Sequence, residues 1–364
     1  MIFRLYFVLT CSVLVLAVFA PAALAEDPLV NYPVFDQAQY ETPPSEESSP
    51  PPNTPESPNI EQVTEAQVSS ASRSVDLTRW SEVIGDQSQI GSCTSWATAY
   101  GLTGWWANKL GRKQGYSYIS SSWLKIPGEP KSLWFTSLWD WYGRGDSKNF
   151  YLNPMSVYGH MSGYKNVGTL IGETMKYISK RGVTPSYNSF ASPWNFRHHS
   201  SSVEVRSARP FRLKNPHQVV AYRATNCWGK KKGCYEYNGN YWYEMGIGKK
   251  GIDKIKAVLS SGRPVAISMD LQKSFFRPKW PYGQKNCAPE VECGAHAMLA
   301  VGYTPSGLLL QNSWGMAWGY TKNGKKPIIS KTNGEWTGRR GYILVKWATA
   351  ASDISELWTA DGLR

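Results

Sequence analysis

Four residues that lie far apart in the sequence have the side chains needed for acyl transfer through a cysteine. Cys93 follows Gln87 by six residues in the run Gly-Ser-Cys-Thr, and His296 and Asn312 come much later. A cysteine attacks as its thiolate, a histidine exchanges its proton, and an amide holds that histidine in one tautomer. Gln87 and the backbone N–H of Cys93 can stabilise the resulting oxyanion. The set predicts a nucleophilic cysteine site.

Cys93 is expected at the start of a helix. Apolar residues recur at helical spacing after it, Ser92 is a suitable N-cap, and Lys109-Leu110-Gly111 supplies a basic last turn with a glycine stop. A helix N-terminus and a nearby imidazolium both lower the pKa of a thiol. Both features are therefore expected to lower the pKa of Cys93 and to favour its thiolate.

Further helices and strands follow from the spacing of apolar residues and their stops. Helices are predicted from about Thr169 to Arg181 and from Ile252 to Ser261. The predicted strands are Val265–Ser268, Ala297–Tyr303, Leu308–Leu310 and Tyr342–Lys346. Helices first and strands later indicate an α+β chain with two lobes. A cleft between the lobes is the expected substrate site.

The motifs around these residues resemble the papain family of cysteine peptidases. The similarity lies in Gln87-x5-Cys93, Gly-Ala-His296-Ala and Gln-Asn312-Ser-Trp314-Gly, with Trp318-Gly following. Shorter similar blocks are Val75-Asp76-Leu77, Leu152-Asn153-Pro154 and Gly341-Tyr342-Ile343. The resemblance implies a papain-like two-lobe fold, with a helical lobe and a strand-rich, barrel-like lobe. It also implies peptide-bond hydrolysis through an acyl-enzyme.

The resemblance assigns roles to individual residues. Cys93 is the nucleophile, His296 the general base and acid, Asn312 its orienting partner, and Gln87 the oxyanion donor. Gly168, Trp314 and Trp318 are the expected substrate-site residues: Gly168 binds substrate backbone, Trp314 shields the His296–Asn312 bond, and Trp318 lines the leaving-group side.

The chain departs from the family pattern near the nucleophile and in its length. Thr94 stands where papain has Trp, which resembles a bacterial Gly-Ser-Cys-Thr form, and Ile90 stands where a disulfide cysteine is usual. Surplus length falls in the stretches Gly111–Phe150, Asn195–Lys250, Gln272–Glu290 and Tyr320–Thr337. We expect these insertions to rim the cleft, so the family's specificity rules are not carried over.

The N-terminal region has two parts. Residues 1–25 have an apolar run, Tyr6 to Ala20, followed by Ala23-Leu24-Ala25, which is typical of a secretory signal peptide. The alternative is an uncleaved anchor, although the run is barely long enough to span a bilayer. Residues 26–75 read as an acidic, Pro/Ser-rich disordered linker or short pro-segment. Residues 76–364 then form the peptidase domain, secreted or periplasmic, with no membrane association after signal cleavage.

The cysteines after the signal suggest two small disulfide loops. Cys227 and Cys234 form one close couple, and Cys287 and Cys293 form another, as expected in an oxidising compartment. Reduced cysteines or a zinc site are the alternatives, but no paired Cys-x-x-Cys or His spacing accompanies them. We expect no metal and no other cofactor. Cys93 remains the odd thiol.

Charge is divided between the tail and the body. The chain has 40 Lys and Arg against 27 Asp and Glu, yet residues 26–75 hold nine acidic residues and one basic residue. The expected partners are a peptide or protein substrate and, through the basic body, an anionic surface polymer. The densest basic cluster is Lys230-Lys231-Lys232. A solvated surface is the plainer alternative. No nucleic-acid module signature is present.

Two other functions fit the same residues. One is transpeptidation or amide hydrolysis of a cell-wall peptide on the same fold. The other is a catalytically dead binding protein, against which the complete Gln87, Cys93, His296 and Asn312 set argues. The acidic tail can also lie on the basic body and control access to the cleft, with a strength that falls as salt rises.

Overall fold

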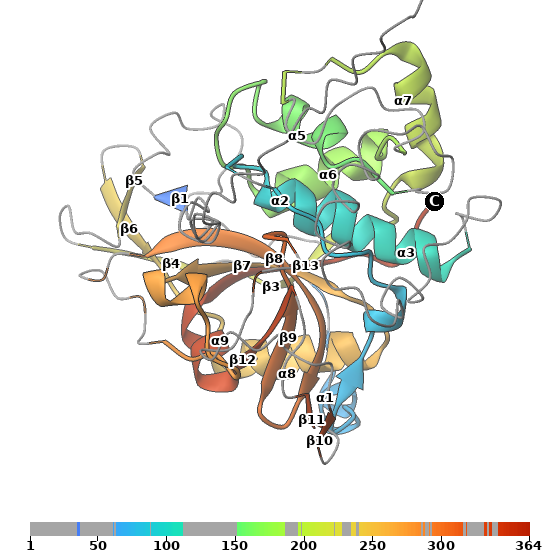
Figure 1. Cartoon of the computed structure of the whole chain (residues 1–364). Helices are drawn as coiled ribbons and strands as arrows, with labels where there is room; N and C mark the ends of the chain where they lie inside the picture. The colour runs from blue at the N-terminus through green and yellow to red at the C-terminus, as the bar shows by residue number, and fades with distance from the viewer. Residues whose placement is uncertain are drawn as a thin grey trace, which may run out of the picture.

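The computed structural model describes most of residues 61–364. Its gaps are 112–150, 186–195, 228–233, most of 285–292, most of 316–340 and a few single residues. Trp318 lies within the last gap but is described, and residues 35–36 are described by their backbone. The signal region and the Lys230–Lys232 cluster therefore lie outside the described residues. Figure 1 shows a helical lobe against a strand-rich lobe, which confirms the predicted α+β fold class.

The helical lobe is built around the segment that begins at Cys93. The segment runs through α2 (Cys93–Ser95), a π-helical stretch (Trp96–Thr103) and α3 (Gly104–Lys109), so the predicted start and end are confirmed. Ser92 occupies the predicted N-cap position, but its side chain makes no capping hydrogen bond. Around this segment lie α5 (Met155–Met161), α6 (Ile171–Arg181) and α7 (Ser202–Ala208).

The Cys93 segment is buried on every side, because every residue from Cys93 to Asn108 is enclosed. Leu102 and Trp105 share one apolar core with Leu299, Leu309 and Leu344 of the sheet. A helix that is apolar all round can only be stable inside a protein. The segment therefore lies between the lobes and carries its first residue to their junction.

The strand lobe is an antiparallel sheet in the order β12-β9-β8-β7-β13-β3. Its strands are β3 (His217–Val220), β7 (Val265–Leu271), β8 (Gly294–Thr304), β9 (Gly307–Gln311), β12 (Tyr342–Lys346) and β13 (Ile354–Thr359). The four predicted strands are confirmed, with β7 and β8 longer than expected. Helices α8 (Gly248–Ser260) and α9 (Trp347–Asp353) flank the sheet, and Gly262, at a φ of 80°, follows α8.

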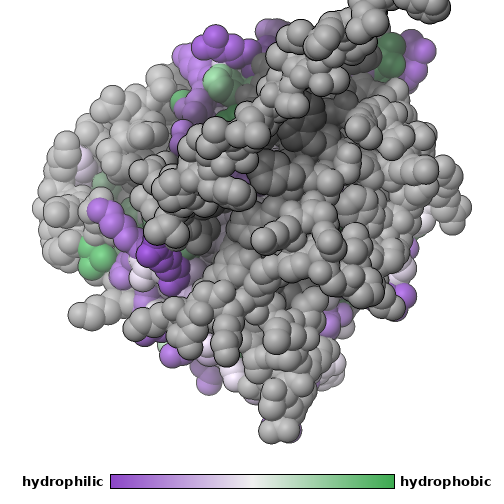
Figure 2. Space-filling model, viewed as in Figure 1, coloured by the Kyte–Doolittle hydropathy of each residue, from purple (hydrophilic) through white to green (hydrophobic). Residues whose placement is uncertain are grey.

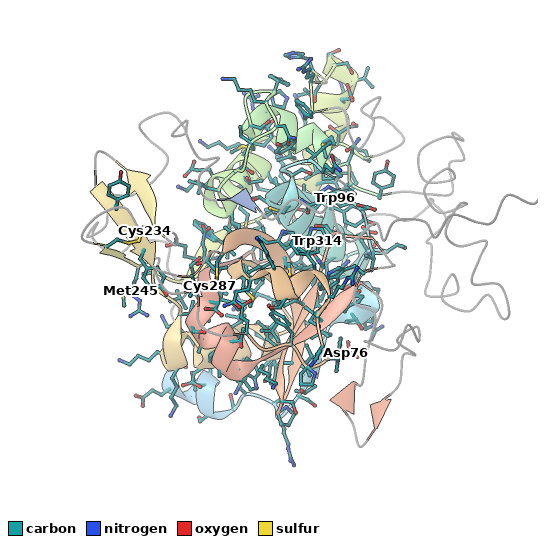
Figure 3. All side chains as sticks on the ribbon, turned by 60° about the vertical axis from the view of Figure 1, so that its left-hand side comes forward. Asp76, Trp96, Cys234, Met245, Cys287 and Trp314 are labelled. Atoms are coloured by element: carbon teal, nitrogen blue, oxygen red, sulfur yellow. A yellow bond between two sulfur atoms is a disulfide. The ribbon has the colours of Figure 1, made fainter. Side chains whose placement is uncertain are left out.

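The insertion Asn195–Lys250 does more than rim a cleft. It supplies β3 at the outer edge of the main sheet, beyond β13, so the expectation is wrong for that part. It also forms a separate sheet of β4 (Ala224–Asn226), β6 (Asn240–Glu244) and β5 (Tyr235–Tyr237). The predicted Cys227–Cys234 disulfide forms beside this sheet, where Figure 3 shows Cys234 near Met245.

Large exposed apolar side chains are few among the described residues. They are Leu110, Val203, Val205 and Met245, and most coloured atoms in the view of Figure 2 are hydrophilic. None of the described helices has both the length and the apolar character required to cross a membrane.

The last part of the predicted linker is folded onto the strand lobe. Residues 65–69 form helix α1, capped by Thr64, and β2 (Val75–Asp76) pairs with β8. The Glu61 carboxylate accepts two hydrogen bonds from Arg263, at 2.8 and 3.1 Å, and a third from His217. Arg263 also donates to Asp361 at 3.0 Å. Glu61 thus anchors the segment that enters the peptidase domain.

We predict that Glu61→Gln lowers the free energy of unfolding at pH 7 by about 2 kcal/mol, the size of a hydrogen bond to a charged group. Burial raises the pKa of Glu61, but Arg263 and His217 outweigh it, so the net pKa lies below its ordinary 4.5. The stabilisation is therefore complete above pH 4.5 and disappears as the pH falls through the folded pKa.

Urea unfolding of the wild type and Glu61→Gln between pH 3 and 7 measures this contribution. Glu65→Gln, on the exposed side of α1, is the matched control and should cost less than about 0.5 kcal/mol. Equal losses in the two variants would contradict an anchoring role for Glu61.

Candidate active site

Cys93 occupies the first position of α2 at the junction of the lobes. Its thiol is free and its side chain is 5% exposed. Cys93 shares one core cluster with Ala297. Because Ala297 follows His296 on β8, the fold brings the predicted nucleophile beside the strand that carries the predicted base.

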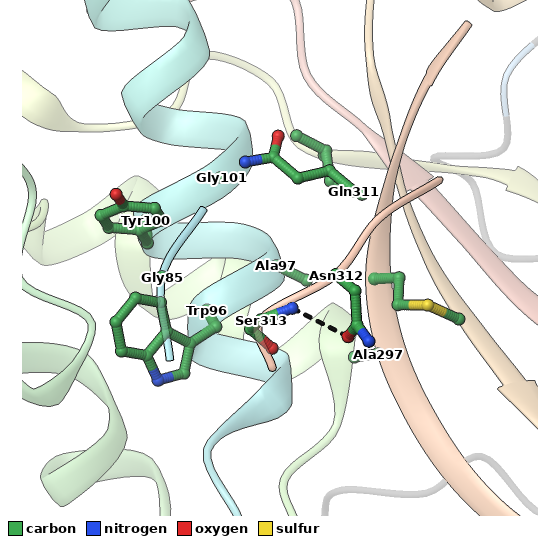
Figure 4. Close-up of a pocket in the computed structure, with 11 residues that line it drawn as sticks. Gly85, Trp96, Ala97, Tyr100, Gly101, Ala297, Gln311, Asn312 and Ser313 are labelled. Carbon is green, nitrogen blue, oxygen red and sulfur yellow. Dashed lines mark hydrogen bonds between the residues drawn. The ribbon is translucent and has the colours of Figure 1, made fainter. Parts of the chain in front are cut away.

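His296 and Asn312 form a buried hydrogen bond. His296 Nε2 lies 2.7 Å from Asn312 Oδ1, and Oδ1 also accepts from the Ser313 N–H at 2.8 Å, drawn in Figure 4. Two donors on one atom identify it as the amide oxygen. Nε2 therefore carries the hydrogen and Nδ1 is the basic nitrogen of a neutral ring. Nδ1 is buried and has no hydrogen-bond partner among the described residues.

Aromatic rings enclose the His296–Asn312 bond. The Trp314 ring lies 4.5 Å from the His296 ring, and the Phe276 ring stacks on Trp314 at 5.3 Å. Trp318 meets Trp314 edge-on at 5.6 Å. Both tryptophans are fully buried. The two buried rings exclude water from the His296–Asn312 bond. Contact of either ring with substrate remains a prediction.

Gln87 is hydrogen-bonded to the loop that carries Asn312. Its Oε1 accepts from Ser313 Oγ at 2.6 Å, and its Nε2 donates to the Ile90 carbonyl at 3.0 Å. Because the Ile90 carbonyl can only accept, the atom that faces it is the Gln87 nitrogen, which fixes the amide orientation. One Nε2 hydrogen remains for another acceptor. Ser313 is a site residue that the sequence motif contains but that our sequence analysis missed.

The loop that carries Gly168 lies against the nucleophile segment. Thr94 Oγ1 donates to the Thr169 carbonyl at 2.7 Å, and Asn166 Oδ1 accepts from the Gly91 N–H at 2.8 Å. These bonds hold Gly168 close to Cys93 and explain the Thr94 departure, since its hydroxyl fastens the two loops. Binding of substrate backbone by Gly168 remains a prediction.

The electrostatics favour a neutral pair. Burial raises the pKa of the Cys93 thiol and outweighs the backbone N–H groups beside the sulfur. Burial also lowers the pKa of His296 to about 4, against the opposing effect of the Asn312 bond. The expected lowering of the Cys93 pKa is therefore wrong for this arrangement, because desolvation outweighs the opposing effects.

The N-terminal segment reaches the strand that carries His296. The backbone of β1 (Phe35–Asp36) pairs antiparallel with Ala295 and Gly294 of β8. The opposite edge of β8 pairs with β7 here, and β9 joins β8 only from Leu299 onward. A piece of residues 26–75 thus lies next to the predicted base.

The second predicted disulfide also forms close to the site. Cys287 is bonded to Cys293, which precedes the first residue of β8, Gly294. Among the described residues, no group of His, Cys, Asp and Glu side chains is arranged to hold a metal ion.

The fold is shared with a solved cysteine protease. No protein-family model and no curated protein matches the sequence. Xylellain, a cysteine protease from Xylella fastidiosa, matches over 86% of this chain and 95% of its own, with 16% identity and a TM-score of 0.54. A Carica candamarcensis cysteine protease in complex with E-64 matches at 14% identity, over 80% of this chain and all of its own, with a TM-score of 0.45. The chain therefore has a papain-like fold.

Proposed function

We propose that the protein is a secreted cysteine peptidase that hydrolyses peptide bonds in peptides or proteins. The observation that carries this proposal is the His296–Asn312 bond, which leaves the basic Nδ1 in the buried site where β8 meets Cys93. The two disulfides support an oxidising compartment. The signal-peptide prediction concerns residues 1–25, outside the described residues.

The reaction begins when His296 Nδ1 takes the Cys93 thiol proton and the sulfur attacks the substrate carbonyl. The resulting oxyanion accepts hydrogen bonds from the remaining Gln87 Nε2 hydrogen and the Cys93 backbone N–H. Asn312 stabilises the imidazolium through the Nε2–H bond. His296 then returns the proton to the leaving amine, and the C–N bond breaks to give a thioester.

Water completes the cycle. His296, neutral again, removes a proton from the attacking water while the water oxygen adds to the thioester carbonyl. The C–S bond then breaks, the thiol regains its proton from His296, and the carboxylic acid leaves. The same two residues therefore serve both half-reactions.

We predict that Cys93→Ala reduces peptide hydrolysis by about 10⁴-fold or more, because no other group supplies the nucleophile. Labelling by an epoxysuccinyl thiol-protease inhibitor should also disappear. Peptide turnover and mass spectrometry measure the two effects. Lys249→Ala, at an exposed position of α8, is the control and should behave like the wild type. Unchanged turnover in Cys93→Ala would sink the assignment.

We predict that Ser313→Ala lowers kcat about tenfold with little change in KM, because the Gln87 amide loses the bond that orients it. Gln87→Ala should lower kcat about 10²- to 10³-fold. If Ser313 acts through Gln87, the double variant should be no slower than Gln87→Ala alone. Additive losses would mean that the two residues act independently.

The acyl-enzyme can also transfer to an amine, so the products separate hydrolysis from transpeptidation. We predict that a peptide substrate with about 10 mM glycinamide yields mainly the free acid, because water reaches the thioester at far higher concentration. Chromatography with mass detection identifies both products. A dominant amide product would favour the transpeptidase instead. Binding without turnover across a peptide library would favour a binding protein.

We also propose that residues 26–60 act as a short pro-segment that covers the site. The pairing of β1 beside His296 supports this role, as do the burial of Cys93 and the opposite charges of tail and body. Glu61 would remain as the anchor at the point where the pro-segment meets the strand lobe.

We predict that removing residues 26–60 lowers the apparent pKa of Cys93, because solvent reaching the sulfur relieves the desolvation that raises it. Alkylation by iodoacetamide should then be faster at pH 6–7 than in the full mature chain, and the difference should shrink in high salt. Cys93→Ala identifies alkylation at other sites. Identical pH profiles for the two chains would rule out a covering role.

A further inference from the structure

A hydrogen-bonded cluster outside the proposed catalytic set lies behind the strand that carries His296. Its centre is the side chain of Gln284. Nε2 donates to Asp353 Oδ2 at 2.9 Å and to the Asp270 carbonyl at 2.8 Å. Oε1 accepts from the Tyr282 hydroxyl at 2.5 Å and the Gln272 N–H at 3.0 Å. Nε2 also lies 3.2 Å from Cys287 Sγ. The Asp270 carbonyl can only accept and the Gln272 N–H can only donate, so the orientation of the amide is fixed.

Asp353 is the second member of the cluster. It ends α9, is 1% exposed, and its other oxygen, Oδ1, accepts from the Cys287 N–H at 3.0 Å. Burial of a carboxylate is costly unless its oxygens receive hydrogen bonds. Asp353 therefore joins α9 to Gln284 and Cys287 through two directed bonds.

The cluster is connected to both β8 and β7 close to His296. On one side, the disulfide connects Cys287 to Cys293, directly before Gly294 at the start of β8. On the other side, the Gln284 amide holds Asp270 of β7, which lies opposite Ala295, the neighbour of His296. His296 itself lies opposite Met269. One contact, at Cys293, therefore lies three residues before His296 in the chain. The other, at Asp270, lies one residue from Met269, the residue opposite His296.

We propose that Gln284, Asp353 and the Cys287–Cys293 disulfide form a positioning clamp for His296. His296 is the third residue of β8, and the ladder with β7 ends two residues before it, where Gly294 lies opposite Leu271. The Asn312 bond fixes the ring but not the strand that carries it. The clamp fixes the strand, so His296 Nδ1 keeps its place relative to Cys93. This inference rests on the proposed function for its kinetic consequence.

The two disulfides of the chain provide a matched test. We expect Cys287→Ser/Cys293→Ser to lower kcat about 10- to 100-fold with KM nearly unchanged, because a misplacement of about 1 Å costs on the order of 10²-fold in rate. Cys227→Ser/Cys234→Ser, beside the separate sheet, removes a disulfide of similar loop size and should keep kcat within about twofold.

Asp353→Asn tests the clamp without touching a cysteine. The amide that replaces one carboxylate oxygen cannot accept both the Gln284 and Cys287 donors, so we expect a loss of kcat similar to that of the disulfide variant. Circular dichroism and thermal unfolding identify variants that remain folded at the assay temperature. A folded Asp353→Asn protein with wild-type kcat would overturn the proposal.

A measurement that needs no turnover separates this proposal from the proposed function. In ¹⁵N-labelled protein, the His296 imidazole should show the single Nε2–H tautomer in the wild type and in Cys227→Ser/Cys234→Ser. Exchange-broadened His296 signals are expected in the clamp variants. If the wild type hydrolyses no peptide, the function fails while the spectra still test the clamp. Unchanged His296 signals in all folded clamp variants would overturn it.

Discussion

The hydrogen bond from His296 Nε2 to Asn312 Oδ1 is the interaction on which the proposed peptide hydrolysis depends. It selects the tautomer whose Nδ1 is basic, and it does so inside the protein, where Trp314 excludes water. Such a bond is strong in a low-dielectric interior and costly to leave incomplete. Much of the surrounding structure keeps its partners in register: β8 carries the imidazole, and the loop after β9 carries the amide.

The lobes meet through a helix that has no solvent-facing side. The segment from Cys93 to Lys109 packs against the sheet and against the other helices, so its first residue is held at the junction. Two hydroxyls then secure the surrounding loops. Thr94 fastens the nucleophile segment to the Gly168 loop, and Ser313 fastens the Asn312 loop to Gln87. Small polar side chains thus set the relative positions of larger functional groups.

Burial protects the site and also suppresses its charged form. The thiol of Cys93 has a raised pKa and the imidazole of His296 a lowered one, both because water is excluded. A thiol and an imidazole that are both neutral can be buried together without the cost of burying two charges. The N-terminal strand β1 pairs with β8 directly before His296.

The sequence by itself determined the two disulfide pairings, the α+β class and four strands of the sheet, and it supplied the candidate catalytic residues, because motif spacing and apolar periodicity are local properties. The helix from Cys93 to Lys109 was predictable in its bounds, but its π-helical middle and the missing capping hydrogen bond at Ser92 were not. Only the tertiary structure decided the burial that shifts both pKa values, the place of β3, the contacts of Glu61 and the Gln284–Asp353 hydrogen bond. Burial and long-range hydrogen bonds depend on residues that the fold alone brings together.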